Sequence, residues 1–533
     1  MQRKEFIRLS LAIAGINGLL PSCVSRRKIK GQIVGASSSI GHLLRDKKPG
    51  ASVETTRKKV VIIGGGVSGL SAARHLQEKG IEDFVLLDLE KEVGGNATSG
   101  KNSVSAYPWG AHYVPIPNND LSEYIAFLKQ CNVITGVNKE GFPIYNDYYL
   151  CFDPEDRLYI NGRWQEGIIP NFGVPDLEKK QIEKFLKLMD EYRHLKGSDE
   201  KDVFAIPVDN SSKDRSFTEL DNTTMKQWLL NNAFTSSYLH SYINYCTRDD
   251  FGTRYDQCSA WAGIHYFAGR KGKGANAEHG DLLTWPEGNG FLVKQLEADI
   301  KTKLKTGCLA SKIIIAGNSV KVDYLDVATK TIKTIEAEQC ILAVPQFIAG
   351  RLLQDEERSK TVKAQFNYSP WMVANLCVTN LEERSGAPLS WDNVLYESES
   401  LGYVNATQQL TQQHFEKRNL TYYLPLTNKD PVEERKSAQS KTHEEWVSLI
   451  MDDLRKVHPN IEEMTEEINV MVWGHAMAQP TPGFIHSGIR QELAASLQNR
   501  VHFAHTDLAG ISIFEEAFYQ GLAAAKKLIA QLS

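Results

Sequence analysis

A glycine-rich turn between an apolar run and a helical pattern constrains the fold of this chain most strongly. The stretch VVIIGGGVSGLSAARHL begins at residue 60, so a G-x-G-x-x-G turn follows a buried-strand pattern and opens a helix. In such a turn Gly64 permits the tight bend, Gly66 lets the backbone approach a pyrophosphate, and Gly69 lets helix and strand pack closely. Free N–H groups at the helix start also favour phosphates. We therefore predict a bound dinucleotide, held by Gly64, Gly66, Val67, Ser68 and Gly69.

An acidic residue stands at the spacing that this motif requires. A helix is expected over residues 68–79, and FVLLDL, residues 84–89, predicts a second strand. Asp88 ends that strand about 20 residues beyond the turn, where a carboxylate accepts hydrogen bonds from ribose hydroxyls. The turn and the acid together indicate a dinucleotide, but they do not distinguish FAD from NAD.

Size and composition limit the function classes. A chain of 533 residues is too long for one ordinary core, so two or more domains are expected. A net charge of −4 argues against a dedicated nucleic-acid binder, and no run reaches the roughly 18 apolar residues of a membrane span. The eight cysteines show neither a C-x-x-C pair nor zinc-ligand spacing. We predict no metal site and no disulfide framework, with most cysteines serving as small buried apolar residues.

The N-terminus reads as an export signal. Residues 1–23, MQRKEFIRLSLAIAGINGLLPSC, have a basic start, an apolar run and small residues before Cys23. LPSC resembles the lipobox of bacterial lipoproteins, which implies lipidation at Cys23. RKEFIR resembles a twin-arginine motif in which Lys4 replaces the second arginine; a general export signal or an uncleaved anchor are the alternatives. With a basic and Ser/Gly-rich linker over residues 24–57, we expect a periplasmic lipoprotein that contacts the membrane through this anchor only.

The rest of the chain alternates between two kinds of sequence pattern. Strand and helix patterns of a nucleotide-binding domain recur after long mixed blocks, as in the strands expected over residues 313–326 and 330–345 and the helix over 513–532. A helical pattern over residues 176–195 belongs to the first mixed block. This predicts a nucleotide domain built from residues 58–115, 281–350 and 491–533, with a substrate domain built from residues 116–280 and 351–490.

Several separated patches resemble the flavin-containing amine oxidase superfamily, which includes phytoene desaturase-like enzymes. The patches are VGG at residues 93–95, WGAHYV at 109–114, WPEGNG at 285–290, ILAVP at 341–345, HFAHTD at 502–507 and EEAFYQG at 515–521. The resemblance spans about residue 58 to the end. It implies an α/β fold, with a Rossmann-like FAD-binding domain of the GR2 type and an interleaved α+β substrate-binding domain. It also implies non-covalently bound FAD, because no cysteine stands in the loop at residues 510–514.

The same resemblance assigns site residues. Asp507 would face the ribityl or phosphate end of the flavin, and the N–H of Phe514 would stabilise charge that develops at flavin C2=O. His112 is a candidate catalytic group beside the flavin ring; a buried structural histidine is the alternative. Asn96 stands where the family often has an arginine, so one cationic phosphate contact is missing or supplied from elsewhere. The further predicted cofactor contacts are Gly94, Gly95, Asn96, Gly110, Ala111, His112, Tyr113 and Ala310.

Two departures from the family pattern concern the substrate side. Many members carry a lysine shortly after A-V-P, and that place falls near Gly350, beside Arg351. The loop at residues 510–514 also lacks the tyrosine that often forms one wall of an aromatic cage. The segment RDDFG at residues 248–252 is interpreted as a solvated turn rather than a pocket. Candidate pocket aromatics are Trp261, Tyr266, Trp391, Tyr396, Tyr403, Tyr422, Tyr423 and Trp473.

The resemblance implies an oxidoreductase. The leading hypothesis is oxidation of the C–N bond of a small amine or polyamine, by hydride transfer to flavin N5 and onward transfer of electrons to O2 or another acceptor. One alternative is a desaturase or dehydrogenase of an apolar, isoprenoid-like substrate, which the missing lysine favours and export disfavours. The other alternative is a flavin-fold binding protein without turnover.

Overall fold

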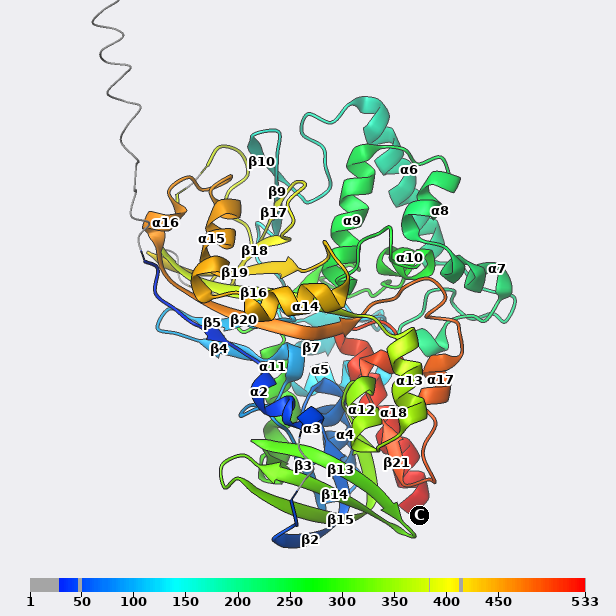
Figure 1. The fold of residues 1–533 in the computed structure, drawn as a ribbon. Helices are drawn as coiled ribbons and strands as arrows, with labels where there is room; N and C mark the ends of the chain where they lie inside the picture. The colour runs from blue at the N-terminus through cyan, green and yellow to red at the C-terminus, as the bar shows by residue number, and fades with distance from the viewer. Residues whose placement is uncertain (1–27, 47–49, 383, 412–415, 533) are drawn as a thin grey trace, which may run out of the picture.

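Two β-sheets divide the molecule, and each is assembled from segments that are far apart in the sequence (Figure 1). The computed structural model describes residues 28–46, 50–382, 384–411 and 416–532. The first sheet holds β12 (Leu304–Lys305), β3 (Phe84–Leu87), β2 (Glu54–Ile63), β15 (Thr331–Leu342), β14 (Ser319–Asp326) and β13 (Cys308–Ala316) in that order, with β21 (Val501–Phe503) also paired to β15. The strands β12, β3, β2, β15 and β21 run parallel. Three separated parts of the chain therefore complete one Rossmann-like sheet.

The glycine turn joins β2 to α4 (Val67–Glu78) as the motif requires. Gly64 has φ +103°, which a residue with a Cβ rarely adopts. A Cβ on Gly69 would lie 1.9 Å from the carbonyl oxygen of Gly64, so only glycine permits this approach of helix to strand. On its other side α4 packs against the C-terminal helix α18 (Phe514–Leu532), where a Cβ on Gly521 would lie 2.2 Å from the oxygen of Ser68. These contacts bury both helices against the sheet.

The second sheet is largely antiparallel and forms the substrate side. Its order is β1 (Ile33–Val34), β20 (Thr465–Ala478), β16 (Tyr368–Thr379), β19 (Lys417–Pro425), β18 (Gly402–Asn405), β17 (Asp392–Leu395), β9 (Asp156–Ile160) and β10 (Arg163–Glu166). Alternate residues of β16 face opposite sides. Met372 packs toward Trp446 of α15 (His443–Leu454), whereas Trp371 and Val373 cluster with Tyr423 on the other face. That second face looks toward the cavities of the molecule.

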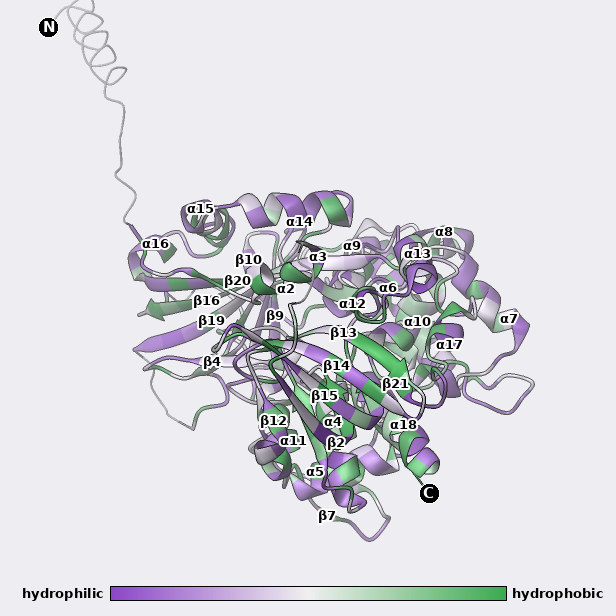
Figure 2. Ribbon diagram, turned by 60° about the horizontal axis from the view of Figure 1, so that its bottom comes forward, coloured by the Kyte–Doolittle hydropathy of each residue, from purple (hydrophilic) through white to green (hydrophobic). Residues whose placement is uncertain are grey.

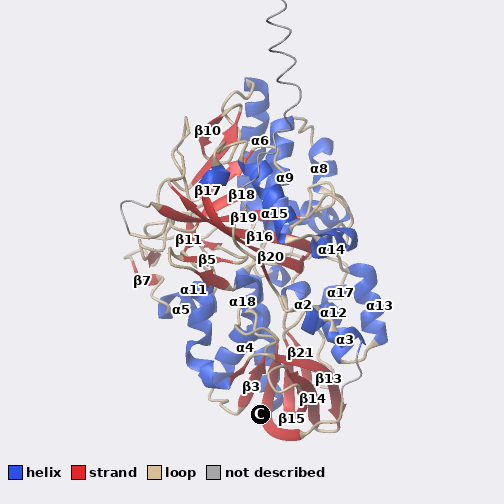
Figure 3. Cartoon of the chain, turned by 60° about the vertical axis from the view of Figure 1, so that its left-hand side comes forward, coloured by secondary structure: helices blue, strands red, loops and turns tan. Residues whose placement is uncertain are grey.

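A group of helices covers the far end of the second sheet (Figure 3). Its main members are α6 (Asp176–Arg193), α8 (Met225–Asn231), α9 (Ser237–Phe251) and α10 (Ala260–Ala268). The other helices are α5 (Ser122–Gln130), α7 (Arg215–Thr218), α11 (Gly290–Glu297), α12 (Gln346–Leu352), α13 (Glu356–Gln365), α14 (Pro431–Ser440), α16 (Ile461–Met464) and α17 (Ile489–Leu493). Short strand pairs join β4 (Ser99–Lys101) to β5 (Ala106–Pro108), β6 (Tyr113–Pro115) to β11 (Leu282–Thr284), and β7 (Ile134–Val137) to β8 (Pro143–Tyr145). In Figure 2 the outer helix α14 is mostly hydrophilic.

The architecture matches the predicted α/β class, with differences in detail. The helix predicted over residues 68–79 is α4, and the helical pattern over 176–195 is α6. The single strand predicted over residues 313–326 is instead a hairpin of β13 and β14. Gly317, at φ +59°, turns the chain between them, and each strand then pairs along the sheet.

The N-terminal region also differs from its prediction. The predicted signal, with Cys23, lies in residues 1–27, outside the described residues. Residues 28–46 fall in the predicted linker, yet they fold onto the molecule as β1, α2 (Ser38–Gly41) and α3 (Leu43–Asp46). Ile29 is buried in the core between the second sheet and α15, and Leu44 packs against the main core. Tertiary contacts of this kind leave no periodic pattern in a short segment.

Two further observations concern the cysteines and the membrane. The seven described cysteines are free thiols, and six of them are buried, as expected for small apolar residues. Among the described residues, no helix combines the length and the apolar character needed to cross a bilayer.

Candidate active site

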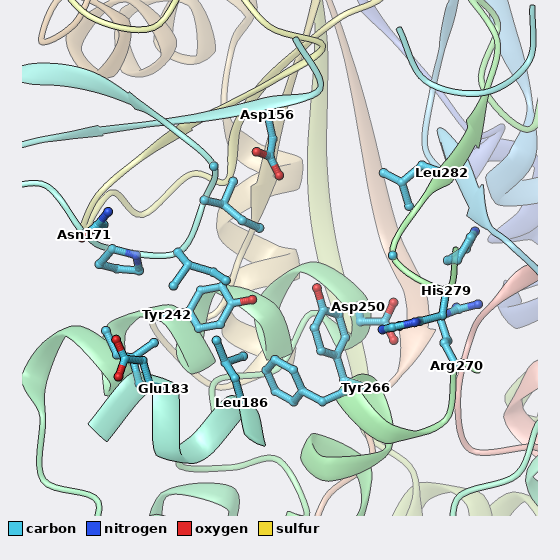
Figure 4. A pocket seen from close by; sticks show the side chains of 18 of the residues that line it. Asp156, Asn171, Glu183, Leu186, Tyr242, Asp250, Tyr266, Arg270, His279 and Leu282 are labelled. Carbon is cyan, nitrogen blue, oxygen red and sulfur yellow. The ribbon is translucent and has the colours of Figure 1, made fainter. Parts of the chain in front are cut away.

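Three adjacent cavities, which share lining residues, lie between the surface and the start of α18. The outer funnel, of about 770 Å³, lies between α6, α9 and the loop after β10. Figure 4 shows Asp156, Tyr242, Tyr266 and Leu282 pointing toward this space from β9, α9, α10 and β11. An inner chamber of about 170 Å³, lined by Asp249 and Asp392, adjoins it. A third cavity of about 140 Å³, lined by Gly110 and Phe514, borders both; it is called the flavin cavity here because the sequence resemblance predicts these residues beside the flavin. Tyr113 lines all three cavities, so the substrate and cofactor sides meet at this residue.

The glycine turn presents an open face to a ligand. Nothing lies within 4 Å of the position that a Cβ on Gly66 would occupy, although Gly66 caps the N-terminus of α4. Gly66 pairs with Gly94, and the N–H of Gly94 donates to the carbonyl of Gly65 at 2.8 Å. Two backbone turns therefore stand side by side around the helix start, with room for a phosphate group.

Asp88 is fixed beside this turn. One carboxylate oxygen accepts the N–H of Gly65 at 2.5 Å, and the other accepts the N–H of Glu90 at 2.7 Å. Burial raises the pKa of Asp88 to about 6, although both backbone N–H groups lower it. Ala310 lies close to this end of the site, because the N–H of Cys308 in the same strand donates to the oxygen of Asp88. The predicted ribose-binding acid and Ala310 thus lie on one side of the glycine turn.

Asp507 lies on the other side of the site and is held by the protein. It is 1% exposed, and its Oδ2 accepts the N–H of Gln346 at 2.8 Å and the hydroxyl of Tyr368 at 2.6 Å. Its Oδ1 lies 3.0 Å from Nδ1 of His505. Burial raises the pKa of Asp507, but His505 and these donors outweigh it and lower the pKa overall. The carboxylate therefore stays ionised.

The segment of residues 109–114 forms the wall between the flavin cavity and the inner chamber. A Cβ on Gly110 would lie 2.3 Å from the backbone oxygen of Asn96, and the N–H of Ala111 donates to that oxygen at 2.9 Å. Asn96 lines the flavin cavity together with Gly110 and Ala111, and its side-chain amide donates to the backbone oxygen of Ala476. The turn after the two glycines is thereby tied both to residues 109–114 and to β20.

His112 stands in an aromatic group. Its ring stacks on Tyr423, with centroids 4.5 Å apart, and lies 5.5 Å from the ring of Trp391. Tyr113 contacts the edges of both His112 and Trp391. Burial lowers the pKa of His112 to about 4, against a smaller rise from a backbone hydrogen bond at Gly110. His112 is therefore neutral near pH 7 and acts as a polar wall of both inner cavities rather than as a cationic acid.

The inner chamber is acidic. Its acidic lining residues are Glu155, Asp156, Asp249 and Asp392. The hydroxyl of Tyr113 donates to Asp249 at 3.3 Å, and the hydroxyl of Tyr245 donates to Asp392 at 3.1 Å. Burial, with a smaller contribution from neighbouring carboxylates, raises the pKa of Asp249 and of Glu155 to about 7. Burial likewise raises the pKa of Asp392 well above its usual range.

A buried ion pair closes the flavin cavity near the helix start. Arg270 donates to Glu515 at 2.7 Å, and Glu515 is 1% exposed. Asp250 lines the same cavity, and burial raises its pKa to about 6 while Arg270 lowers it. Phe514, the first residue of α18, also lines this cavity. The predicted backbone site at Phe514 is thus adjacent to a carboxylate that is already paired.

Comparison with known proteins decides the family. A family model described as flavin containing amine oxidoreductase matches residues 67–529. The chain belongs to this family. It is therefore an FAD-dependent oxidoreductase, and the predicted enzyme class and the predicted non-covalent FAD are confirmed at that level.

The matches to individual curated relatives cover less of this chain than the match to the family model does. The chain is 29% identical over 120 residues to polyamine oxidase 7 of Oryza sativa subsp. japonica, and the match spans 22% of this chain and 24% of that protein. It is 25% identical over 238 residues to prenylcysteine oxidase 1 of Rattus norvegicus, spanning 42% and 44% of the two chains. These matches cover less than half of either curated relative. A solved structure of putrescine oxidase bound to putrescine has TM-score 0.64 and 15% identity, covering 89% of this chain and all of that one; this likeness shows the fold.

The residues of the site fit FAD. Gly66 leaves open space where a pyrophosphate would lie, and Asp88 stands beside it. In the flavin cavity, Oδ1 of Asn289 and Nε1 of Trp371 are buried without a hydrogen-bond partner among the described residues. An acceptor and a donor left unpaired in one cavity are expected where a polar ring system completes their hydrogen bonds.

The structure places several residues of the substrate side differently from the predictions. Tyr266, Trp391, Tyr423 and Trp473 line the cavities, whereas Trp261, Tyr396, Tyr403 and Tyr422 pack elsewhere. Residues 248–251 are the last turn of α9, not a solvated turn, and Asp249 and Asp250 face the cavities. Gly350 lies buried in α12 against Ser359, away from the three cavities, and no lysine is among the described residues that line the two inner ones. Aromatic walls come from β16, β19 and β20, and the C-terminal loop contributes Phe514 in place of a tyrosine.

Sequence reasoning missed the acids of the inner chamber. Asp156 and Asp392 begin two neighbouring strands of the second sheet, β9 and β17, and Glu155 directly precedes β9; the pairing of these strands is not visible in the sequence. On α9 a signal was present. Tyr242, Tyr245 and Asp249 recur at spacings of three and four, which place them on one helical face.

Proposed function

We propose that this enzyme oxidises the C–N bond of a small amine. The observation that carries the proposal is the inner chamber, in which four carboxyl groups and an aromatic group lie between the surface funnel and the flavin cavity. Buried carboxylates without a cation are costly. An ammonium group offsets that cost by ion pairing, and aromatic faces add cation–π attraction. A cationic substrate is therefore the ligand that this chamber stabilises.

An amine that moves from the outer funnel toward the flavin cavity would contact these residues one after another. Asp156 lines both the outer funnel and the inner chamber, so it is placed to attract a cation at the entrance. Asp392 and Glu155 line the inner chamber and not the outer funnel, and the backbone N–H of Asp392 donates to the backbone oxygen of Glu155 at 2.8 Å. Tyr423 and His112 then form a wall shared with the flavin cavity. This order carries an amine toward the reacting position with its charge compensated.

Asp249 is placed to hold a proton. It lines both the inner chamber and the flavin cavity, and burial raises its pKa to about 7. A group with this pKa accepts a proton from an ammonium near neutral pH and leaves the neutral amine that can be oxidised. Bound FAD supplies the redox chemistry, by accepting a hydride equivalent from the C–H bond beside the nitrogen. The neutral His112 and the aromatic walls exclude water from that position.

An apolar, isoprenoid-like substrate is the second candidate. The match to prenylcysteine oxidase 1 favours it, since that relative aligns over 238 residues. An apolar substrate would offer neither a charge nor a hydrogen bond to the four buried carboxyl groups of the inner chamber, whose pKa values are raised. The chamber therefore favours the amine.

Anaerobic substrate mixing tests the proposal. We expect the flavin absorbance to bleach with one or more of putrescine, spermidine and monoamines, and to stay unchanged with an isoprenoid alcohol or prenylcysteine. Asp392→Asn should raise KM for the amine about tenfold or more, because one charged partner of the cation is lost. Asp256→Asn, which removes a carboxylate outside the chamber, should leave KM unchanged. Bleaching by prenylcysteine but by none of the amines would select the second candidate.

The electron acceptor and the location belong to the same proposal. We expect O2 to re-oxidise the reduced enzyme, which stopped-flow mixing with aerated buffer measures directly. We also propose that the N-terminal signal exports the protein to the periplasm and that Cys23 is lipidated. Labelling with a radioactive fatty acid, in the native chain and in Cys23→Ser, tests lipidation; equal labelling of both would reject it.

A further inference from the structure

Residues 28–46, here called the N-terminal strap, connect the two sheets of the enzyme. At one end β1 pairs in parallel with β20, at Val470 and Met471. The approach is close, because a Cβ on Gly31 would lie 1.7 Å from the carbonyl oxygen of Ile468. The strap precedes residue 67, where the match to the family model begins.

The middle of the strap contacts the nucleotide side of the site. The N–H and the hydroxyl of Ser37 donate to the two carboxylate oxygens of Glu90, at 2.8 and 2.9 Å. A Cβ on Gly41 would lie 3.5 Å from the side chain of Leu89. Leu89 and Glu90 directly follow Asp88, whose carboxylate is held by the N–H of Gly65. The strap therefore passes beside the predicted ribose-binding acid.

The C-terminal end of the strap places one positively charged side chain near two others. Arg45 is in α3, which lies beside α12 in Figures 1 and 3, and α12 carries Arg351. Arg435, from α14, donates to the backbone oxygen of Tyr368 at 2.8 Å. His475 lies among them, and its pKa falls to about 3 through burial and then through Arg435, Arg45, Arg351 and His42. Three guanidinium groups, of which those of Arg45 and Arg351 are exposed, thus act on one half-buried imidazole.

This cationic group lies directly behind Asp507. The ring of His475 is 4.4 Å from that of Phe347, and the neighbouring Gln346 donates its N–H to Asp507. Tyr368 links the same places, since its backbone oxygen binds Arg435 and its hydroxyl binds Asp507. The strap therefore reaches from the neighbours of Asp88 to the neighbours of Asp507, which are the residues predicted to bracket the phosphate part of FAD.

Like charges gathered at one place are unfavourable unless an anion joins them. The pyrophosphate of FAD carries two negative charges. Asn96, at the position where the family often has an arginine, is neutral, and its amide is already bonded to the backbone of Ala476. We propose that the N-terminal strap closes over the nucleotide half of bound FAD and that Arg45, with Arg351 and Arg435, supplies the phosphate-binding charge that Asn96 lacks.

The test compares ligands with and without phosphate. Arg45→Ala in the full chain should raise the Kd for FAD about tenfold, because a charge-assisted contact is lost. The Kd for riboflavin, which has no phosphate, should stay unchanged; quenching of flavin fluorescence measures both. Lys28→Ala is the matched control, since it removes one positive charge from the same strap at its other end, where Lys28 lies 3.9 Å from Glu444. This variant should bind FAD like the native chain.

A second measurement separates closure from charge. Ser37→Ala removes the hydroxyl hydrogen bond to Glu90 and leaves the backbone one; it should speed the release of FAD from the holoenzyme severalfold, while the salt dependence of release is retained. Arg45→Ala should reduce that salt dependence, because fewer charges hold the phosphates. Equal weakening of FAD and riboflavin in Arg45→Ala would reduce the residue to a structural role. Unchanged FAD binding in both Arg45→Ala and Ser37→Ala would reject the proposal.

Discussion

The imidazole of His112 stacks on the phenol of Tyr423, with ring centroids 4.5 Å apart and planes inclined by 29°. The hydroxyl of Tyr423 also donates to the backbone oxygen of Gly110 at 2.9 Å. A single side chain of β19 therefore holds the segment that separates the flavin cavity from the inner chamber. The substrate domain thus fixes a wall of the cofactor site, although the two belong to different sheets.

Removal of the Tyr423 hydroxyl should have a small, measurable cost. In Tyr423→Phe we expect the free energy of unfolding to fall by about 1 kcal/mol, because one buried hydrogen bond is lost while the ring contact stays. Tyr423→Ala should cost about 3–5 kcal/mol, since it also leaves a cavity beside His112. Urea unfolding measures both. Tyr148→Phe is the control, because Tyr148 is 67% exposed and should unfold like the native protein.

The pH dependence of stability should report the buried carboxyl of Asp249. Burial, and next Asp250, raise its folded pKa from 3.8 to about 7, so its contribution to stability is fully present below about pH 4 and is lost as the pH rises through about 7. In Asp249→Asn this loss is absent. Relative to the native protein, the variant should gain stability between pH 4 and pH 8, by at most about 4 kcal/mol.

A control of opposite sign is available at Asp256. Burial raises the pKa of Asp256, but hydrogen bonds and the charge of Arg254 outweigh it and lower the pKa below 3.8. Its contribution to stability is therefore present above the unfolded pKa and lost as the pH falls through the folded one. Asp256→Asn should lose stability relative to the native protein as the pH rises to about 4. Parallel pH profiles of the two variants would contradict the assignment of Asp249.

Asp88 should matter for the nucleotide half of FAD and not for the flavin. Asp88→Ala removes the carboxylate beside the glycine turn, so we expect the Kd for FAD to rise about tenfold or more while riboflavin binding changes little. Asp83→Ala is a matched control in the same region, because Asp83 precedes β3 and pairs with Lys58 at the surface. Isothermal titration with both flavins distinguishes the two variants. FAD retention equal to that of the native chain would remove Asp88 from the cofactor site.

The buried pair of Arg270 and Glu515 should behave differently in single and double variants. Arg270→Met leaves Glu515 as an uncompensated buried charge, so the free energy of unfolding should fall by about 3–5 kcal/mol. Adding Glu515→Gln removes that charge and should restore part of the loss. Thermal unfolding of the holoenzyme measures both effects. If the double variant were less stable than Arg270→Met by the full cost of a second mutation, the two side chains would not be coupled.

The local parts of the fold were predictable because they follow from short-range patterns. The turn at Gly64 and the acid at Asp88 belong to one β–α–β unit, in which helix, strand and glycine spacing are fixed by neighbouring residues. The interleaved domains could also be inferred, since the recurring strand patterns mark where the first sheet resumes.

The chemistry of the inner chamber could not be predicted in the same way. Asp249 and Asp392 are 143 positions apart, and only the packing of α9 against β17 and β18 brings them to one cavity. The pair of acids at the end of α9 was interpreted as solvated because charged pairs are usually exposed. The strap belongs to a basic and Ser/Gly-rich stretch, which predicts a linker, although packing of Ile29 and Leu44 holds it on the molecule.

Substitutions of two glycines in the same turn should have different effects, one on stability and the other on FAD affinity. Gly69→Ala places a Cβ 1.9 Å from the oxygen of Gly64, so helix and strand must separate, and the protein without FAD should lose about 3 kcal/mol of stability. Gly66 has φ −71° and open space around it, so Gly66→Ala should fold with a loss within about 1 kcal/mol. Its methyl group points to the space for the pyrophosphate, and FAD affinity should fall at least about tenfold. Urea unfolding of the FAD-free proteins and FAD titration separate the two effects, and a Gly66→Ala protein that binds FAD normally would place the phosphates elsewhere.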